Sequence, residues 1–231
     1  MNWDFGAVVP FLPDLFAGAV MTIVMTVLVL IVGTITGLVL AVLRTSGRRW
    51  ITIPTSLYID FFRTTPPIVQ IIWIYFVVPQ FLPVPLGAYE AAVVALGLNI
   101  GAFLAETFRA GIESVGRGQR DAARVLGLTR IQEFRWIVLP QAVRTILPPA
   151  VTTAALTVKS TSLAGILAIL ELTYRGTLIS QLTLRPLEVF TLIAIIYFVM
   201  VYPLWATGRH LERRLSAGQR DAVRAIEAAA A

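Results

Sequence analysis

One uncharged run constrains this chain more than any other feature: the 29 residues between Asp14 and Arg44 carry no ionised side chain. About 20 predominantly apolar residues suffice for a helix to cross the roughly 30 Å hydrocarbon core of a bilayer. A soluble domain would need charged surface to cover such a run, yet only 14% of this chain is charged, against about 25% in soluble proteins. No Lys or Arg precedes the run, and it is too long for the apolar region of a cleaved signal peptide. The sequence therefore predicts an integral membrane protein.

Similar apolar stretches recur along the chain, and we expect each to be helical, because a helix satisfies its own backbone hydrogen bonds in lipid. Segment 160–170 is apolar but too short to span, so it is expected to be interfacial or re-entrant. The five expected spans are residues 15–43, 58–81, 90–109, 139–161 and 189–208. The expected fold class is an all-α integral membrane protein with five transmembrane helices, in which residues 1–231 form a single transmembrane domain.

The basic residues are distributed asymmetrically. Segment 1–14 holds two Asp and no Lys or Arg, whereas the tail 209–231 holds five Arg. Together with segments 44–55 and 109–144, the tail accounts for 15 of the 19 basic residues. Because cytoplasmic segments of membrane proteins are rich in Lys and Arg, we expect the N-terminus outside, the C-terminus in the cytoplasm, and a multi-pass location in the cytoplasmic (inner) membrane. The net charge of +6 is then explained without a nucleic-acid partner.

The expected cytoplasmic loop, residues 110–136, contains a pattern suited to protein docking. A short helix in this loop would place Ala122, Val125 and Leu128 on one face, since residues three apart are neighbours on a helix surface. Gly127 is expected to end that helix, as glycine commonly does. From periodicity alone, a plain surface helix or an interfacial anchor remains an open alternative.

Three parts of this region occur at fixed spacing: Asp121-Ala122-Ala123, then Gly127, then Ile137-x-Leu139-Pro140. This skeleton resembles the EAA loop of permease subunits in bacterial ATP-binding cassette (ABC) importers, with Asp121 in the usual Glu position. Other segments resemble the polar-amino-acid (histidine/glutamine-type) branch of that family, namely residues 62–67, 106–112, 140–142 and 159–163. The resemblance covers about residues 15–210.

The resemblance implies a type I importer-like fold that moves polar amino acids or related small zwitterions into the cytoplasm by alternating access. It also implies that the loop helix docks into a groove on a separate ATPase subunit and transmits its closure to the spans. The implied partners are ABC ATPase subunits, a second permease subunit (identical or paralogous), an extracytoplasmic solute-binding protein and the lipid bilayer. The residues implied to carry the coupling are Gly118, Gln119, Arg120, Asp121, Ala122, Ala123, Gly127, Ile137, Leu139 and Pro140.

The chain lacks the sequence motifs of an enzyme. No G-x-x-x-x-G-K-[ST] phosphate loop occurs, since the only lysine, Lys159, follows Val158. ATP and Mg²⁺ are therefore expected in the partner subunit, with no cofactor in this chain. There is no cysteine, and the only histidine, His210, follows the last expected span. We accordingly expect no metal site and no catalytic residue.

Polar side chains within the spans are candidates for the translocation pathway, because they are costly in hydrocarbon and usually have a function there. Glu106 lies three residues before Arg109, and the two could simply pair with each other. Lys159 could line the pathway or lie at the outer interface, and Asn99 could face a cavity or bond across helices. The candidates are Gln70, Asn99, Glu106, Lys159, Thr161 and Ser162.

The sequence departs from the family pattern in three places, which bear on the substrate class and not on the coupling. Residues 99–103 replace the usual approach to span three, Thr152 and Thr153 stand where an Asn is often found, and Gly116 stands where a Pro is common. The alternative function is a gradient-driven secondary transporter or channel subunit. That class would favour internal inverted repeats, and we find no five-span repeat.

Overall fold

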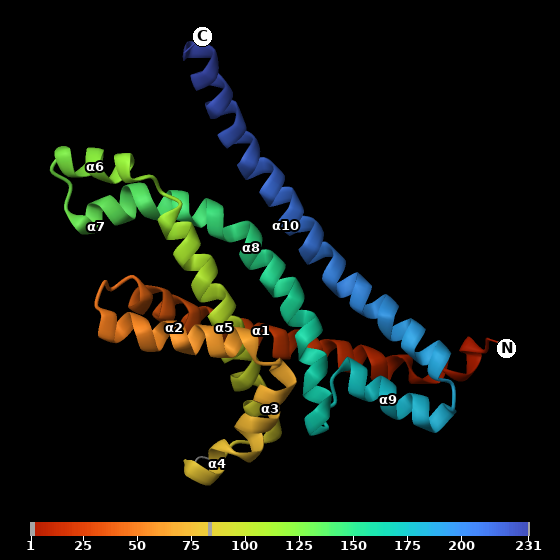
Figure 1. Ribbon diagram of the computed structural model, residues 1–231. Helices are drawn as coiled ribbons and strands as arrows, with labels where there is room; N and C mark the ends of the chain where they lie inside the picture. The colour runs from red at the N-terminus through yellow and green to blue at the C-terminus, as the bar shows by residue number, and fades with distance from the viewer. Residues whose placement is uncertain (1–2, 83–84, 231) are drawn as a thin grey trace.

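The computed structural model describes residues 3–82 and 85–230, and all regular structure in these ranges is helical, which confirms the all-α expectation. Residues 1–2, 83–84 and 231 of the expected domain lie outside the described residues. Figure 1 shows the helices in chain order. They are α1 (Leu12–Arg44), α2 (Arg49–Thr64), α3 (Pro67–Phe76), α4 (Val78–Phe81), α5 (Ala88–Glu113), α6 (Arg117–Val125), α7 (Arg130–Glu133), α8 (Leu139–Ser160), α9 (Leu172–Thr183) and α10 (Pro186–Ala230). Shorter 3₁₀ segments lie at Phe5–Ala7, Val9–Phe11 and Thr161–Leu167, and a π-helical segment lies at Phe134–Val138.

Several helical segments in the described part of the chain are long and apolar enough to cross a membrane. Four are unbroken, and a fifth crossing results if α2 together with α3 and α4 counts as one bent span. The apolar segment after α8 is a short 3₁₀ helix and not a further span. The four unbroken segments are Phe5–Arg44, Ala88–Glu113, Arg130–Leu167 and Pro186–Leu215.

The second span differs from its expected bounds of 58–81. Its helix begins earlier, at Arg49, and the chain bends by 109° between α2 and α3. Pro66 accounts for the break, because proline lacks an N–H and disfavours helical backbone at the residue before it. Thr65 is accordingly extended, with ψ 136°. The expected bounds followed charge and hydropathy, neither of which registers a break inside an apolar run.

Glycines let α1 and α5 pack closely, and this pair makes the most extensive helix–helix contact in the described chain. Gly33 and Gly37 lie on α1, and Gly97 and Gly101 lie on α5. A Cβ atom added to Gly101 would lie 2.8 Å from the Cβ of Thr36, closer than real side chains approach. Small residues four apart are the usual means of close helix approach in lipid, where no hydrophobic force drives helices together.

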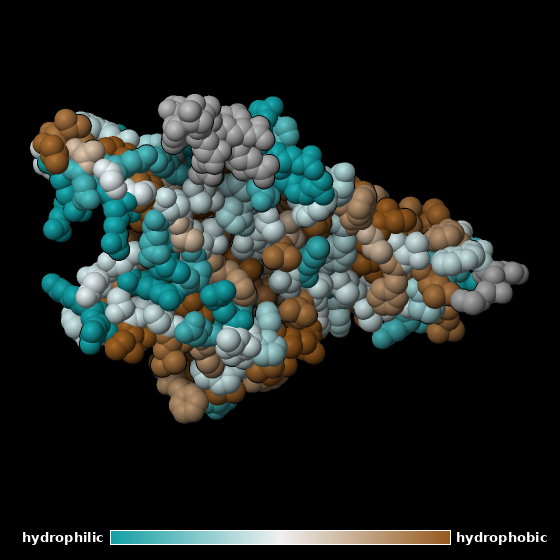
Figure 2. All heavy atoms as spheres, turned by 45° about the horizontal axis from the view of Figure 1, so that its top comes forward, coloured by the Kyte–Doolittle hydropathy of each residue, from teal (hydrophilic) through white to brown (hydrophobic). Residues whose placement is uncertain are grey.

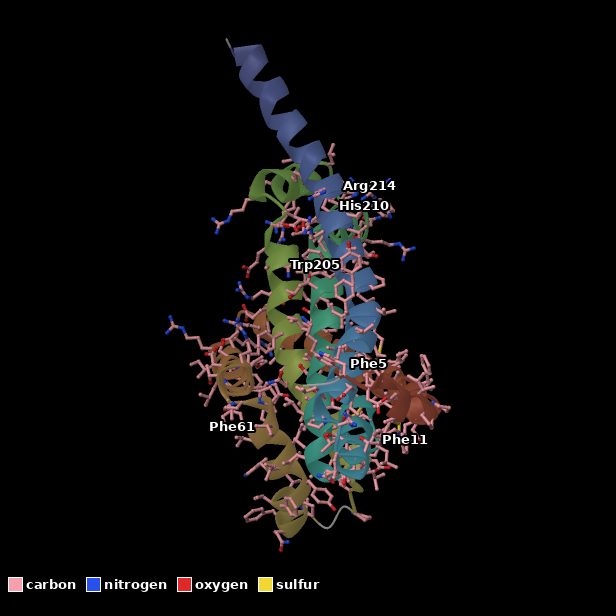
Figure 3. All side chains as sticks on the ribbon, turned by 90° about the vertical axis from the view of Figure 1, so that its right-hand side faces the viewer. Phe5, Phe11, Phe61, Trp205, His210 and Arg214 are labelled. Atoms are coloured by element: carbon pink, nitrogen blue, oxygen red, sulfur yellow. The ribbon has the colours of Figure 1, made fainter. Side chains whose placement is uncertain are left out.

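The remaining long helices flank this pair. α8 lies between α5 and α10, and the three run side by side (Figures 1 and 3). At one end of the bundle α9 packs against α1 and α10 near the N-terminus. At the other end, here called the loop end, lie α6, α7 and the turn between α1 and α2. Figure 2 shows hydrophilic residues gathered at the loop end and hydrophobic ones over the middle of the bundle.

The distribution of apolar side chains fits a membrane environment. The largest buried cluster lies where α1, α3 and α5 meet, and includes Met25, Ile71 and Leu96. The outer faces of α1 and α10 nevertheless expose large apolar side chains such as Phe16 and Phe198, which are 60% and 63% exposed. Water would disfavour this exposure, whereas lipid acyl chains cover it.

Candidate functional site

The loop helix α6 ends in a hydrogen-bonded turn at Gly127. The Leu128 N–H donates to the Ala123 carbonyl (3.1 Å), and the Gly127 N–H donates to the Arg124 carbonyl (3.0 Å). This pair of bonds is a Schellman motif, which places the residue after the helix in the left-handed region. Gly127 has φ +75°. The prediction that Gly127 ends this helix is confirmed.

Helices α6 and α7 are held together as one unit, here called the loop unit (Arg117–Glu133). Thr129 caps α7 through a reciprocal capping box with Gln132. The Arg124 guanidinium on α6 lies 3.4 Å (Nε–Oε2) from the Glu133 carboxylate on α7, and Glu133 is buried. Separating a charge pair that has a buried member leaves that charge uncompensated. The ion pair therefore links the two helices.

The loop unit presents large apolar side chains outward. Val125, Leu126 and Ile131 are 88%, 78% and 79% exposed, although the surrounding segment is rich in Arg and Gln. The face predicted from spacing included Leu128, which is half-buried instead. The Schellman turn explains the difference, because it redirects the chain after Val125 and ends the helical periodicity. Exposed apolar patches bordered by polar residues commonly mark protein-interaction sites.

Side-chain hydrogen bonds tie the loop unit and the end of α5 to the first turns of α8. The Gln141 amide donates to Gln119 Oε1 (2.6 Å) and to the Ile137 carbonyl (3.0 Å). The Ser114 hydroxyl, just after α5, donates to the Thr145 hydroxyl (3.3 Å). These bonds connect α6 and the end of α5 to the start of α8.

The other residues of the predicted coupling set lie on α6 or in the segment that leads from α7 into α8. Arg120 donates to the Ile112 carbonyl at the end of α5. Asp121 forms an ion pair with Arg124 at 3.6 Å. The rest are placed as follows: Gly118 and Ala122 exposed on α6, Ala123 buried on α6, Ile137 in the π-helical segment, and Leu139 and Pro140 in the first turn of α8.

Two of the predicted pathway residues donate hydrogen bonds to backbone carbonyls at the bend between α2 and α3. Gln70 and Asn99 are buried, and both side-chain amides donate to the Phe62 carbonyl, at 2.9 and 2.7 Å. Gln70 also donates to the Thr65 carbonyl (3.0 Å), and Asn99 donates to Gln70 Oε1 (3.1 Å). The last carbonyls of a helix have no intrahelical partner, and lipid offers none. Of the two alternatives for Asn99, the structure shows the hydrogen bond across helices.

Glu106 lies in an ion-pair network at the loop end of α1 and α5. Its carboxylate pairs with Arg44 of α1 and with Arg109, whose Nη2 lies 2.8 Å from Glu106 Oε2. Arg109 also pairs with Glu113. The pairing of Glu106 with Arg109, expected as an alternative to a pathway role, is therefore present.

Lys159 lies on the wall of a hollow between α8 and α10. Its side chain is exposed in a hollow of about 450 Å³ that is otherwise lined mainly by apolar and aromatic residues, among them Tyr197. Thr161 is buried and donates to the Val158 carbonyl (2.7 Å), and Ser162 donates to the Lys159 carbonyl (2.7 Å). These two hydroxyls follow Lys159 in sequence but satisfy the backbone at the end of α8.

A buried carboxylate braces one wall of this hollow. Glu171 caps the N-terminus of α9, accepting from the backbone N–H groups of Thr173 (2.8 Å) and Tyr174 (2.7 Å). The Tyr197 hydroxyl donates to Glu171 Oε2 (3.1 Å). Burial raises the pKa of the Glu171 carboxyl, and these hydrogen bonds oppose the rise. Glu171 thus joins α9 to the α10 wall beside Lys159.

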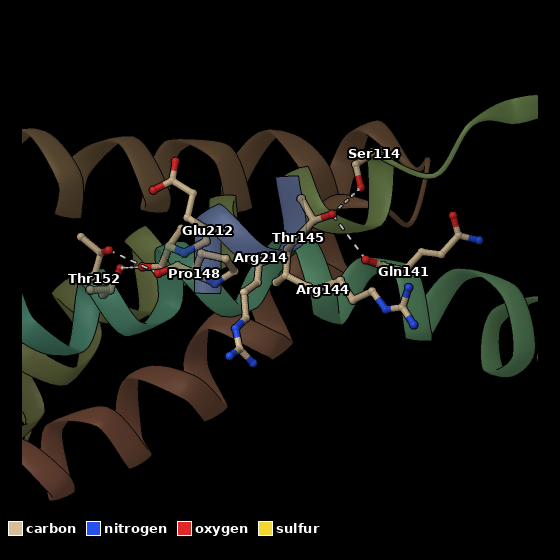
Figure 4. A pocket seen from close by; sticks show the side chains of 11 residues that line it. Ser114, Gln141, Arg144, Thr145, Pro148, Thr152, Glu212 and Arg214 are labelled. Carbon is tan, nitrogen blue, oxygen red and sulfur yellow. Dashed lines mark hydrogen bonds between the residues drawn. The ribbon is translucent and has the colours of Figure 1, made fainter. Parts of the chain in front are cut away.

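A second, polar hollow of about 920 Å³ opens at the loop end beside α8 and α10 (Figure 4). It shares Thr152 with the Lys159 hollow. Along α8 the polar residues Gln141, Thr145, Thr152 and Lys159 follow at intervals of 4, 7 and 7 residues, which places them on one face. Sequence reasoning did not single out Thr145 or place Thr152 on this polar face, although the spacing would have revealed both. The charged residues that line the polar hollow are Arg144, Glu212 and Arg214.

Within the described ranges, no three His, Asp or Glu side chains come together as a metal site. The described residues combine an exposed apolar surface on the loop unit, hydrogen bonds from α6 to the start of α8, and a polar face on α8 beside two hollows.

The chain matches the family model "Binding-protein-dependent transport system inner membrane component" over residues 33–217. It is 36% identical over 217 residues to the glutamine transport system permease protein GlnP of Escherichia coli (strain K12), covering 93% of this chain and 99% of the relative. It is 40% identical over 194 residues to the octopine transport system permease protein OccM of Rhizobium meliloti, covering 80% and 79%. The arginine transport system permease protein ArtQ of Bacillus subtilis (strain 168) is 33% identical over 218 residues, covering 93% and 98%.

The fold is also similar to those of solved ABC transporters. A crystal structure of an amino acid ABC transporter with histidines superposes with a TM-score of 0.85 at 34% identity, covering 93% of this chain and 100% of that chain. The inward-facing MetNI methionine ABC transporter superposes with a TM-score of 0.75 at 21% identity, covering 89% and 98%. At 21% identity the likeness concerns the fold alone.

Proposed function

The chain belongs to the family of binding-protein-dependent transport system inner membrane components, and we propose that it forms one half of the membrane pathway of an ATP-driven amino-acid importer. It is a multi-pass inner-membrane permease. The relatives named above are permeases for glutamine, octopine and arginine, which supports polar amino acids or related small zwitterions as the substrates.

The single observation that carries this proposal is the loop unit with its exposed Val125, Leu126 and Ile131. Exposed apolar surfaces bordered by polar residues commonly mark protein-interaction sites, and an ABC ATPase subunit is the partner that the family implies. ATP and Mg²⁺ would bind in that subunit, since this chain has no phosphate-loop sequence. The permease itself then contributes no catalytic residue and no cofactor.

Coupling would run from the loop unit to α8. ATP-driven closure of the ATPase subunits displaces α6, and the Gln119–Gln141 hydrogen bond passes the displacement to α8. The polar face of α8 from Gln141 to Lys159 is about 27 Å long at 1.5 Å per residue, which is close to the thickness of the hydrocarbon core. This length supports α8 as a pathway wall that moves when ATP is consumed.

A single chain supplies only one wall of this pathway, so a second permease chain, identical or paralogous, is needed to close it. A solute-binding protein would deliver substrate at the end opposite the loop end. The gathering of hydrophilic residues at the loop end supports placing that end, and the C-terminus, in the cytoplasm, with the N-terminus outside.

Uptake by the complete reconstituted transporter distinguishes ATP-driven import from a gradient-driven carrier. The permease, its ATPase and its binding protein are placed in proteoliposomes, and uptake of radiolabelled L-glutamine, L-arginine and L-histidine is measured. We expect uptake that requires ATP on the ATPase side and survives collapse of ion gradients by an ionophore. Uptake that continues without ATP and stops with the ionophore would establish the gradient-driven alternative.

A surface substitution tests the docking assignment. Leu126→Glu puts a charge into the apolar docking surface, and because Leu126 is 78% exposed, the fold should be unaffected. The matched control is Leu182→Glu, at a leucine that is 74% exposed at the end of α9 away from the loop end. We expect only Leu126→Glu to lose co-purification with the ATPase. Equal retention by both variants would refute docking at this surface.

Lys159 tests the pathway assignment. If Lys159 contacts substrate in transit, Lys159→Ala should lower substrate-dependent uptake more than basal ATPase activity, and Lys159→Arg should restore part of it. Uptake by Lys159→Ala that equals the parent over a full substrate titration would instead place Lys159 at the interface, outside the pathway.

A further inference from the structure

Helix α10 continues far past its apolar part at the loop end. The uncharged run from Val189 to Gly208 is about 30 Å long at 1.5 Å per residue, which matches the hydrocarbon core. The helix then continues from Arg209 to Ala230, which adds about 33 Å. This extension is here called the tail helix, and Figures 1 and 3 show it extending past α6 at the loop end.

The tail helix repeats the sequence of the loop helix α6. Residues 118–126 read GQRDAARVL, and residues 218–226 read GQRDAVRAI. Six of these nine positions are identical, and the other three hold apolar residues in both segments. The first segment forms α6 with its C-cap residue, and the second lies within α10. Because both segments are helical, the same series of residues follows in the same order around each helix axis.

The repeat keeps the residues that α6 exposes. Within this segment of α6 the buried position is Ala123, and the tail helix has a larger valine there. The exposed polar and small residues of α6 recur unchanged in the tail helix. The exposed apolar pair Val125 and Leu126 corresponds to Ala225 and Ile226. What recurs is therefore the outward side of α6, which carries two of the three exposed apolar residues of the loop unit.

The position of the repeat favours a protein partner over lipid. At 1.5 Å per residue, residues 218–226 lie about 15–27 Å beyond Gly208 along the helix, whereas the headgroup layer of one leaflet is about 5–8 Å thick. An ATPase subunit that docks on α6 would occupy the space at this end of the molecule, and the tail helix extends into that space. A docked ATPase subunit would therefore lie beside the tail helix.

We propose that residues 218–226 form a second docking segment for the ABC ATPase subunit, which recognises in them the residue series that α6 presents. Helices are commonly bound in this way, with their apolar residues in a groove of the partner. The inference rests on the proposed function, because it takes the partner of α6 to be an ATPase subunit. Glu227 stands where Gly127 ends α6, and the tail helix continues past it to Ala230. The tail helix thus lacks the turn that leads from α6 toward α8, and it holds the ATPase subunit while the loop unit carries the coupling.

The affinity of the full-length permease, held in nanodiscs, for its ATPase subunit tests the proposal. A charge in place of an apolar contact residue commonly weakens an interface about tenfold or more, so Ile226→Glu should raise the dissociation constant by about that factor. Ala229→Glu is the control, because it puts the same charge on the same helix outside the repeat. Parent-like affinity of Ile226→Glu, or an equal loss in the control, would overturn this inference alone. A parent permease that does not bind the ATPase subunit would refute the proposed function and this inference with it.

Photo-crosslinking in the complete transporter identifies what the tail helix contacts. Benzoylphenylalanine at position 226 should crosslink to the ATPase subunit on illumination. The same probe at position 182, a leucine that is 74% exposed and lies away from the loop end, should not. Crosslinks from position 226 only to a second permease chain would assign the tail helix to contact between two copies, and crosslinks only to lipid would place it on the membrane. Either result would overturn the proposal.

Discussion

Replacing Gly127 by valine should weaken the coupling of ATP hydrolysis to transport through the backbone alone. Gly127 has φ +75° and closes the Schellman turn that follows Val125 and Leu126. A Cβ atom built on Gly127 meets nothing within 4 Å. The substitution therefore creates no clash, and its whole effect comes from the left-handed backbone conformation.

The magnitude follows from this geometry. An L-residue in the left-handed region costs roughly 1–2 kcal/mol relative to glycine, and a β-branched residue falls at the upper end. A cost of that size lowers the population of the closed turn by about 5- to 30-fold relative to the open one. Asparagine tolerates this conformation better, so Gly127→Asn should fall between the parent and Gly127→Val.

The assay is ATP-dependent uptake in proteoliposomes, normalised to permease content, with ATPase activity measured in parallel. Gly116→Val is the control: Gly116 precedes the same helix, has an ordinary φ of −55°, and likewise has nothing within 4 Å of an added Cβ. We expect uptake to decrease in the order parent, Gly116→Val, Gly127→Asn, Gly127→Val, with the first two nearly equal. Parent-like uptake by Gly127→Val, or equal losses in both valine variants, would refute the backbone argument.

Three further substitutions test other parts of the structure. Gly101→Leu drives a side chain into Thr36, so overpacking should cost about 1–3 kcal/mol and lower the thermal unfolding temperature in detergent; an unchanged temperature would contradict the close approach of α1 and α5. Gln119→Leu and Gln141→Leu should each lower the ratio of uptake to ATP hydrolysed, and the double variant should be little worse than Gln141→Leu, because one hydrogen bond is shared; additive losses would show that the two residues act separately. Burial raises the pKa of Glu171 above its ordinary 4.5, so the folded chain holds this proton more tightly than the unfolded chain. The stability that this proton contributes is complete below about pH 4.5 and is lost as the pH rises through the folded pKa. Glu171→Gln should flatten that part of the pH dependence of thermal unfolding, and an unchanged slope would exclude Glu171 as its source.

The sequence predicted the long helices well, because hydrophobic length and charge are properties of consecutive residues. The expected spans 90–109 and 139–161 correspond to α5 and α8 with small changes at their ends. The end of α6 at Gly127 was equally predictable, since the capping bonds join residues no more than five apart. The break in the second span was not predictable in this way. The apolar run continues through Pro66, whereas the helix is interrupted there.

The candidate pathway residues show where such local reasoning ends. From the sequence, Gln70, Asn99 and Lys159 look alike, as polar groups in apolar runs. In the structure, Gln70 and Asn99 turn inward to the carbonyls of the α2–α3 bend, while Lys159 is exposed in a hollow. The bend that needs those amides lies 37 residues from Asn99 in the chain, and no local pattern connects the two.

The sequence by itself determined that this chain crosses the membrane and where its charges gather. These properties depend on the free energy of transferring each segment between water and lipid, which composition fixes. Only the tertiary structure decided which polar groups satisfy the backbone and which remain free to act. That choice depends on the helices that pack together, and it is made by contacts such as those of Gly101 with Thr36 and of Glu171 with Tyr197, which join distant parts of the chain.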